Sequence, residues 1–178
     1  MNLSKTGKRS GLTLIESLVV VGILLGIVAI ALTLYGTVRD RLNVKNESEN
    51  ISFIYAQVSD LFSDETTDDL ENELAVQSGI FPKKMKIVGG NTVYNSWGGK
   101  VVIEGEKDKN GFVLTYNKVP KESVCVDLIR NQRKVGWDSA SVGSKEITFS
   151  EMTTAEVSTG CTGGAGDTVT VIFEYGVE

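Results

Sequence analysis

A single acidic residue interrupts a long apolar segment near the beginning of the chain. Within residues 12–34, a run of 23 residues, Glu16 is the only charged side chain. As an α-helix the run would extend roughly 34 Å, close to the thickness of the hydrocarbon core of a bilayer. Because a charged acid at membrane depth costs on the order of 2.5–3.5 kcal/mol, Glu16 is a functional candidate that needs a partner cation.

The other side chains capable of chemistry exclude most enzyme classes. The chain of 178 residues contains no histidine, which removes histidine-based triads, cysteine–histidine dyads and histidine-containing metal sites. Six carboxylates between residues 64 and 73 lack the spacing of a calcium loop, and the glycine-rich stretch 160–166 lacks the lysine of a phosphate-binding loop. We therefore predict a solvated helix start and a flexible turn at these places, and we expect no enzymatic activity, cofactor or metal.

Composition and charge predict a globular domain behind a membrane-directed leader. The sequence is 41% hydrophobic and 23% charged, which argues against disorder, and its net charge of -5 disfavours a nucleic-acid-binding surface. Residues 1–11 nevertheless carry three basic residues and no acid, and they directly precede the apolar run. Since a basic end stays on the cytoplasmic side of a membrane, we predict membrane targeting in that orientation.

Two ordinary membrane segments fit the apolar run only in part. Small residues at Ala29 and Ala31 offer a site for signal peptidase, which would release an exported domain beginning at Leu32. The apolar region of a signal peptide is usually about 7–15 residues long, however, and this run is longer. A plain single-pass anchor fits the length, but neither interpretation explains Glu16.

The leader and the start of the apolar run resemble those of type IV pilins. The resemblance rests on a basic leader that ends in glycine, a hydrophobic residue after it and an acid four positions later, Lys8-Arg9-Ser10-Gly11 followed by Leu12-Thr13-Leu14-Ile15-Glu16. In that family a prepilin peptidase cuts after the glycine and methylates the new amino group. The resemblance therefore implies processing between Gly11 and Leu12, N-methylation of Leu12, and a role in assembly for Glu16.

Cleavage after Gly11 would also supply the missing cation. The new α-amino group of Leu12 would lie about one helical turn from Glu16 of the same subunit. In a stack of identical helices it can equally face Glu16 of a neighbouring subunit. A helix docked in the wrong register would leave both charges unpaired in an apolar core, so we expect this pair to control register.

The pattern after residue 34 predicts one long helix followed by a largely antiparallel sheet, an α+β fold. No proline occurs in residues 12–81, and apolar residues recur at helical spacing as far as residue 62, which indicates a helix of roughly 50 residues. Its first half, residues 12–37, is apolar on all sides. Its second half, residues 38–62, has one apolar stripe, which is typical of a helix packed on a soluble domain, here residues 38–178.

The remainder divides into a connecting loop with a short helix, residues 63–91, and a sheet region, residues 92–178. The apolar side of a further helix beginning near Pro120 is expected from Val124, Leu128 and Ile129. Segments rich in β-forming residues predict strands at 92–94, 100–104, 112–116, 147–149 and 168–175, with an extended stretch opening at Pro82.

Residues 80–103 narrow the resemblance to the type IVb branch of pilins. Members of that branch carry a Pro-x-x-Met-like turn and an Asn-x-aromatic-Gly-Gly entry into the sheet, and the matching residues here are Pro82-Lys-Lys-Met85 and Asn95-Ser-Trp97-Gly98-Gly99. Thr33 also stands where the type IVa branch commonly has proline. In an exported chain the two cysteines favour a disulfide between Cys125 and Cys161, which by resemblance bounds the variable region near the C-terminus.

The resemblance implies a structural subunit, the major pilin of a type IVb pilus. Its partners would be further copies of itself in a helical filament, the prepilin peptidase, the inner-membrane assembly machinery and minor pilins. The precursor would cross the inner membrane once and then enter an extracellular filament on the bacterial surface. The alternatives are a minor pilin, a type II secretion pseudopilin (a class that typically lacks such a disulfide loop) and an exported binding domain released after Ala31.

Overall fold

The computed structural model describes residues 13–107 and 110–177 of a chain that forms two compact units, residues 1–39 and 40–178. Helix α1, Leu14–Leu61, runs without a break from the first unit into the second. The absence of proline and the helical spacing predicted a helix of this length, and the structure confirms it.

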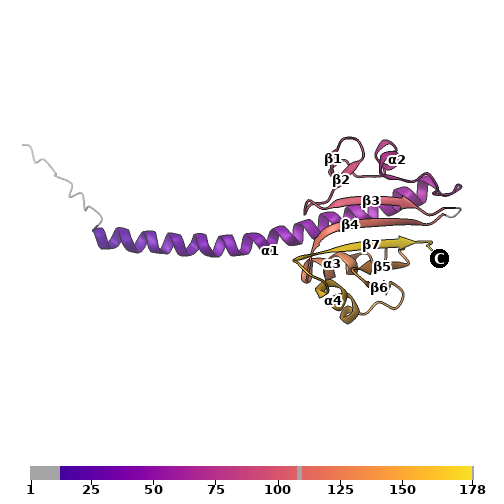
Figure 1. Cartoon of the computed structure of the whole chain (residues 1–178). Coiled ribbons are helices and arrows are strands. Elements are labelled where there is room, and N and C mark those ends of the chain that lie inside the picture. The colour runs from indigo at the N-terminus through magenta and orange to yellow at the C-terminus, as the bar shows by residue number, and fades with distance from the viewer. Residues whose placement is uncertain (1–12, 108–109, 178) are drawn as a thin grey trace, which may run out of the picture. The chain divides into compact units, whose positions relative to one another are not determined.

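The second unit is built around an antiparallel sheet (Figure 1). In the described part of the chain the sheet has seven strands in the order β1-β2-β3-β4-β7-β5-β6. The strands are β1 Lys86–Val88, β2 Thr92–Tyr94, β3 Lys100–Gly105, β4 Phe112–Pro120, β5 Ser139–Val142, β6 Lys145–Thr148 and β7 Thr168–Tyr175. The helices that accompany it are α2 Asn72–Gln77, α3 Ser123–Asn131 and α4 Thr154–Thr162. The predicted α+β fold is therefore confirmed.

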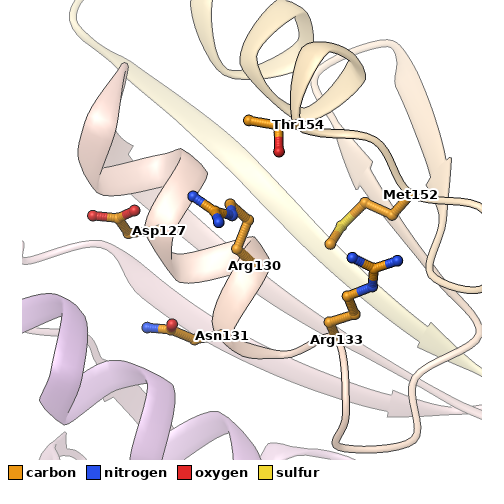
Figure 2. Close-up of a pocket in the computed structure, with 6 residues that line it drawn as sticks. All are labelled: Asp127, Arg130, Asn131, Arg133, Met152 and Thr154. Carbon is orange, nitrogen blue, oxygen red and sulfur yellow. The ribbon is translucent and has the colours of Figure 1, made fainter.

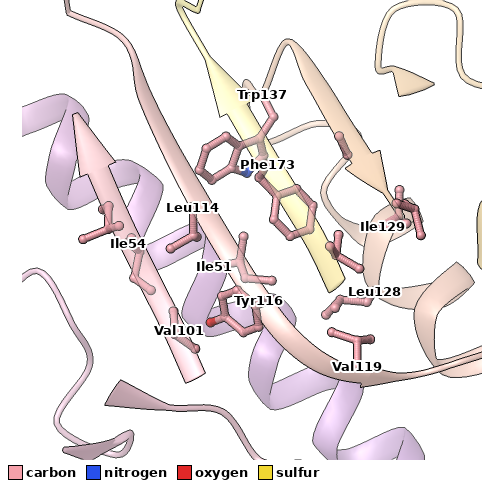
Figure 3. Close-up of a cluster of buried hydrophobic side chains, with 14 of the residues drawn as sticks. Ile51, Ile54, Val101, Leu114, Tyr116, Val119, Leu128, Ile129, Trp137 and Phe173 are labelled. Atoms are coloured by element: carbon pink, nitrogen blue, oxygen red, sulfur yellow. The ribbon is translucent and has the colours of Figure 1, made fainter. Parts of the chain in front are cut away.

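The core lies between the second half of α1 and one face of the sheet (Figure 3). Most of the apolar stripe expected after residue 50 of α1 is buried, with members three or four residues apart as one helix face requires: Ile51, Ile54, Val58 and Phe62. Val44, seven residues before Ile51, is buried on the same face, whereas Val38, Leu42 and Leu61 are exposed. Alternate residues of the central strands meet it from the sheet: Val101, Ile103, Leu114, Tyr116, Val171 and Phe173. Each such side chain contributes roughly 1.5–3 kcal/mol by leaving water, so this interface holds α1 on the sheet.

Two polar side chains also belong to the buried face of α1. Glu47 and Asn50 are 2% and 3% exposed, although they lie in what the sequence presents as a polar stretch. The carboxylate of Glu47 accepts hydrogen bonds from the backbone N–H of Ser96 at 2.7 Å, from the Ser96 hydroxyl, and from Asn50 Nδ2 at 3.1 Å. These bonds offset the cost of burying a charge and attach the β2–β3 turn to the helix.

The structure corrects several boundaries in the second half of the chain. Strand β5 and helix α4 were not predicted, and Cys161 lies in α4 rather than in a turn before the last strand. Three of the four residues of β5, Ser139, Ala140 and Ser141, are small and weakly β-forming, so it is the pairing with β6 and β7 that makes this segment a strand. Pro120 ends β4 instead of opening a helix, because the backbone reverses at Glu122, φ 58°, before α3 begins.

The other strand predictions agree with the structure to within a few residues. The segments at 92–94, 100–104, 112–116 and 168–175 all lie in strands, and the segment predicted at 147–149 overlaps β6, which begins two residues earlier and ends at Thr148. The extended stretch expected from Pro82 contains a strand only at its end, β1. These segments have the strongest β-forming composition, which explains why the sequence revealed them.

Candidate functional site

The first part of α1 presents a continuous apolar surface to solvent. Thirteen large hydrophobic side chains between Leu14 and Leu32 are each at least 47% exposed, although such residues normally avoid water. The helix is long and apolar enough to cross a membrane, and none of its most hydrophobic window is buried within the protein. A surface of this kind marks a segment that is covered by lipid or by other protein.

Glu16 lies in the first turn of this apolar helix and forms a capping box with Thr13. Its carboxylate accepts from the backbone N–H of Thr13, and the Thr13 hydroxyl accepts from the backbone N–H of Glu16, both at 3.4 Å. The motif Thr-x-x-Glu satisfies two N–H groups that have no partner within the helix. The sequence already contained this signal at residues 13–16, but the interpretation of Glu16 as an assembly acid had overlooked it.

The predicted processing residues, Gly11 and Leu12, lie outside the described residues. Among residues 13–38 of α1, Glu16 is the only charged side chain, and the next is Arg39. A cation for Glu16 must therefore come from the chain N-terminal to Thr13 or from another molecule.

The predicted disulfide joins Cys125 and Cys161 and connects two helices. Cys125 lies on α3 and Cys161 on α4, with a Cα–Cα distance of 5.7 Å, and both side chains are fully buried. The apolar side of α3 predicted from Val124, Leu128 and Ile129 is buried as well. A threonine–glutamate capping box at Thr153 and Glu156 begins α4. The bond therefore attaches two short helices to each other beside the sheet.

A pocket of about 320 Å³ opens next to these two helices (Figure 2). Figure 2 shows Asp127, Arg130 and Asn131 on α3, with Met152 and Thr154 across from them. Asn131 Nδ2 donates a hydrogen bond to the Ser48 hydroxyl on α1 at 3.0 Å. Asn131 therefore attaches α3 to α1.

The acidic residues that precede and enter α2 are all exposed, as the prediction of a solvated helix start requires. They are Asp64, Glu65, Asp68, Asp69, Glu71 and Glu73. Within residues 13–107 and 110–177, no group of three or more histidine, cysteine, aspartate or glutamate side chains is arranged to hold a metal ion.

Comparison with known proteins agrees with this geometry. The PilS N-terminal family model matches residues 41–175. A crystal structure of type IVb pilin from Salmonella typhi is 24% identical, with a TM-score of 0.61 over 75% of this chain and 99% of that chain. The NMR structure of type IVb pilin (PilS) from Salmonella typhi is 22% identical, with a TM-score of 0.48 over 74% and 95% of the two chains. None of the curated proteins matches this sequence.

A long N-terminal helix packed on an antiparallel sheet, with a disulfide near the C-terminus, is the fold of a type IV pilin. The family match covers most of the chain, so the chain belongs to the PilS N-terminal family and is a type IVb pilin. Members of this class are structural subunits rather than enzymes.

Proposed function

We propose that this pilin is the major subunit of a type IVb pilus and polymerises through its N-terminal helix. In this proposal the first half of α1 anchors the precursor in the inner membrane and later forms the core of an extracellular filament. The sheet unit, residues 38–178, folds outside the membrane and covers the filament. Residues 1–11 form the leader, and residues 12–37 form the segment that changes from lipid to protein surroundings.

The observation that carries this proposal is the exposed apolar surface between Leu14 and Leu32 on a helix that continues into a well-packed unit. Burial of apolar surface contributes roughly 25 cal/mol per Å², so the segment is stable only in lipid or among other apolar helices. A single-pass anchor would account for the first environment. Polymerisation accounts for both environments, first lipid and then other apolar helices. It also accounts for the single acid in the first turn.

In the proposed pathway the prepilin peptidase cuts between Gly11 and Leu12 and methylates the new amino group. That amine then pairs with Glu16 of a neighbouring subunit as the inner-membrane assembly machinery adds the subunit to the filament. Minor pilins are further partners. The family membership and the position of Glu16 in an otherwise uncharged helix turn support these steps.

The test is to shear surface filaments from cells that express the full chain together with a type IVb assembly system. The filaments are imaged, their main protein is identified by mass spectrometry, and its N-terminus is sequenced. We expect this chain to be the main protein and to begin at N-methylated Leu12. A trace amount in filaments made of another protein would identify a minor pilin. A mature N-terminus at Leu32 would instead identify an exported domain released by signal peptidase.

A further inference from the structure

Side chains of five neighbouring strands form a row across the face of the sheet that is turned away from α1. Lys86 of β1 pairs with Tyr94 of β2, and Tyr94 pairs with Lys100 of β3. The register of β3 and β4, Val101 with Tyr116, brings Lys100 beside Asn117. Since Val93, Val101 and Tyr116 point into the core, their neighbours in the chain point outward.

Hydrogen bonds hold the centre of this row in place. Asn117 Nδ2 donates to the carbonyl of Lys100 at 3.0 Å, and its Oδ1 accepts from the Thr170 hydroxyl of β7 at 3.1 Å. The carbonyl of Asn117 accepts from Asn95 Nδ2 at 2.8 Å. This carbonyl would lie 1.7 Å from a Cβ at Gly99, so the turn before β3 packs directly on β4 only because residue 99 is glycine.

A bulge in β4 places a further cation, Lys118, beside Lys100 of the row. The register between β4 and β7 shifts between Tyr116 and Val119, and Lys118 takes a left-handed backbone conformation with φ 57°. Such a conformation is unfavourable for lysine, and bulges of this kind redirect a side chain out of the strand pattern. Here the bulge makes Lys118 part of the lining of a groove that also contains Lys100.

The groove has a volume of about 600 Å³, and its lining is polar, aromatic and positively charged. Its remaining lining comes from Tyr94, Gly98, Asn117, Thr168, Val169 and Thr170. Among the described residues, neither Lys100 nor Lys118 forms an ion pair. The Lys86 ammonium lies 5.8 Å from the centre of the Tyr94 ring and adds a third positive charge to the same edge. This local excess of positive charge contrasts with the net charge of -5 of the chain.

We propose that this groove binds an anionic carbohydrate, a saccharide that carries carboxylate or sulfate groups. The Tyr94 ring provides an aromatic surface against which the C–H face of a sugar ring can pack. The side chains of Asn117, Thr168 and Thr170 provide donors and acceptors for sugar hydroxyls. The ammonium groups of Lys100 and Lys118 provide point charges for the acidic group. The volume lies within the range of small-molecule sites, and the Asn117 hydrogen bonds hold the lining in position before a ligand arrives.

Saccharide binding in the groove does not require filament formation, so it is measured on the purified full chain in a neutral detergent. The probes are a sulfated heparin tetrasaccharide, a carboxylated galacturonate tetrasaccharide, neutral maltotetraose and linear polyphosphate, each titrated by calorimetry at low salt. We expect at least one of the two acidic saccharides to bind, and the neutral saccharide to bind roughly tenfold more weakly or not at all. Comparison of the sulfated and carboxylated probes identifies the preferred acidic group.

The decisive variants remove charge or the aromatic ring without straining the backbone. A double variant, Lys100→Gln with Lys118→Asn, removes both charges and keeps a residue that tolerates the left-handed conformation at position 118. We expect it to weaken saccharide binding by roughly tenfold or more, and Tyr94→Leu to weaken it several-fold. The matched control, Lys45→Gln with Lys134→Asn, removes the same charge from exposed positions outside the groove and should leave affinity unchanged within about twofold.

A measurement on the unaltered chain guards against variants that misfold. Bound saccharide should protect Lys100 and Lys118 from acetylation several-fold more than it protects Lys45 and Lys134, as read by mass spectrometry. Absence of binding by both acidic saccharides would overturn the proposal, and so would equal protection of all four lysines. Polyphosphate binding as tight as saccharide binding and unaffected by Tyr94→Leu would also overturn it, because the groove would then attract any polyanion.

Discussion

Glu16 has one role that the structure shows and a second role that we propose. Within one chain its carboxylate caps the first turn of α1 through the backbone N–H of Thr13. In the proposed filament the same carboxylate pairs with the α-amino group of Leu12 from a neighbouring subunit. The first task needs only an acceptor oxygen, whereas the second needs a negative charge. Substitutions at this position therefore distinguish the tasks.

We predict that Glu16→Ala yields a subunit that is inserted, cleaved after Gly11 and folded, but assembles poorly or not at all. Glu16→Asp, one methylene shorter, should be intermediate. Glu16→Gln keeps a capping acceptor and loses the charge, so it should fail like Glu16→Ala. The measurement is the yield of surface filaments relative to processed pilin in the membrane. Abundant filaments from Glu16→Gln would show that capping rather than charge matters, and uncleaved Glu16→Ala would assign Glu16 to processing.

A second residue, Tyr116, makes stability depend on pH in alkaline solution. Its side chain is fully buried, and this burial, reinforced by the nearby carboxylate of Glu47, raises the pKa of its hydroxyl well above the usual value of 10.0. The folded protein therefore keeps this proton at pH values where the unfolded chain has lost it. As a result, the free energy of unfolding should fall as the pH rises above about 10, by up to about 1.4 kcal/mol per pH unit.

The Tyr116 effect is measured by urea unfolding between pH 9 and pH 11. Below pH about 10 both states hold the proton, so Tyr116 adds no dependence on pH there. In Tyr116→Phe the alkaline loss of stability should be smaller than in the unaltered protein. Tyr35→Phe, at a side chain that is 68% exposed, is the control and should behave like the unaltered protein. Identical pH curves for Tyr116→Phe and the unaltered protein would contradict the assignment.

At the scale of single elements, the disulfide has the clearest consequence. It attaches α3 to α4, and neither short helix packs its whole surface on the sheet. The two cysteines are separated by 36 positions in the sequence. In the chain-entropy model, a disulfide that closes a loop of this size stabilises a protein by roughly 4 kcal/mol. The bond also keeps α4 near β6 at the edge of the sheet. Few residues of α4 are apolar, so packing alone would hold this helix weakly.

We predict that Cys125→Ser with Cys161→Ser lowers the free energy of unfolding by about 2–5 kcal/mol and reduces the amount of pilin in cells. Thermal unfolding of the purified chain gives the first quantity and immunoblotting the second. Alkylation without reduction should label neither thiol of the unaltered protein. Two labelled thiols in purified filaments would exclude the bond, and an unchanged unfolding temperature in the double variant would show that it contributes little.

At the scale of the whole molecule, the exposed apolar surface and the packed core lie in different units. The core residues of α1, from Val44 onward, all belong to residues 40–178. The exposed apolar side chains between Leu14 and Leu32 belong to the other unit and contribute nothing to this core. The force that would drive polymerisation is therefore separable from the force that folds the sheet unit.

We predict that a chain beginning at Arg39 is a soluble, folded monomer. It keeps the whole buried face of α1 and loses the continuous apolar surface, so burial in lipid or in other helices is no longer required. Size-exclusion chromatography with light scattering, together with circular dichroism, measures mass and fold. Filaments from this fragment would place the polymer contacts in the sheet unit. Failure to fold would show that the sheet unit depends on residues before Arg39.

Features that depend on neighbouring residues could be predicted from the amino-acid sequence. The apolar run with Glu16, the helical spacing through residue 62, the strongly β-forming segments and the two cysteines of an exported chain are local or compositional patterns, and they predicted the membrane segment, the α+β fold and the disulfide. The class of protein was predicted by the resemblance of residues 8–16 and 80–103 to pilins. The capping boxes at Thr13 and Thr153 belong to the same category, although they were not recognised.

Features that depend on contacts between distant segments were visible only in the folded molecule. Ser139–Val142 is a strand because β6 and β7 pair with it, and the cost of burying Glu47 is offset because Ser96, 49 residues away, donates to its carboxylate. The row from Lys86 to Thr170 likewise exists only through the register of five strands. Pairing between distant segments depends on loop closure and packing, which leave no periodic signal in the sequence, so these features had to be seen in three dimensions.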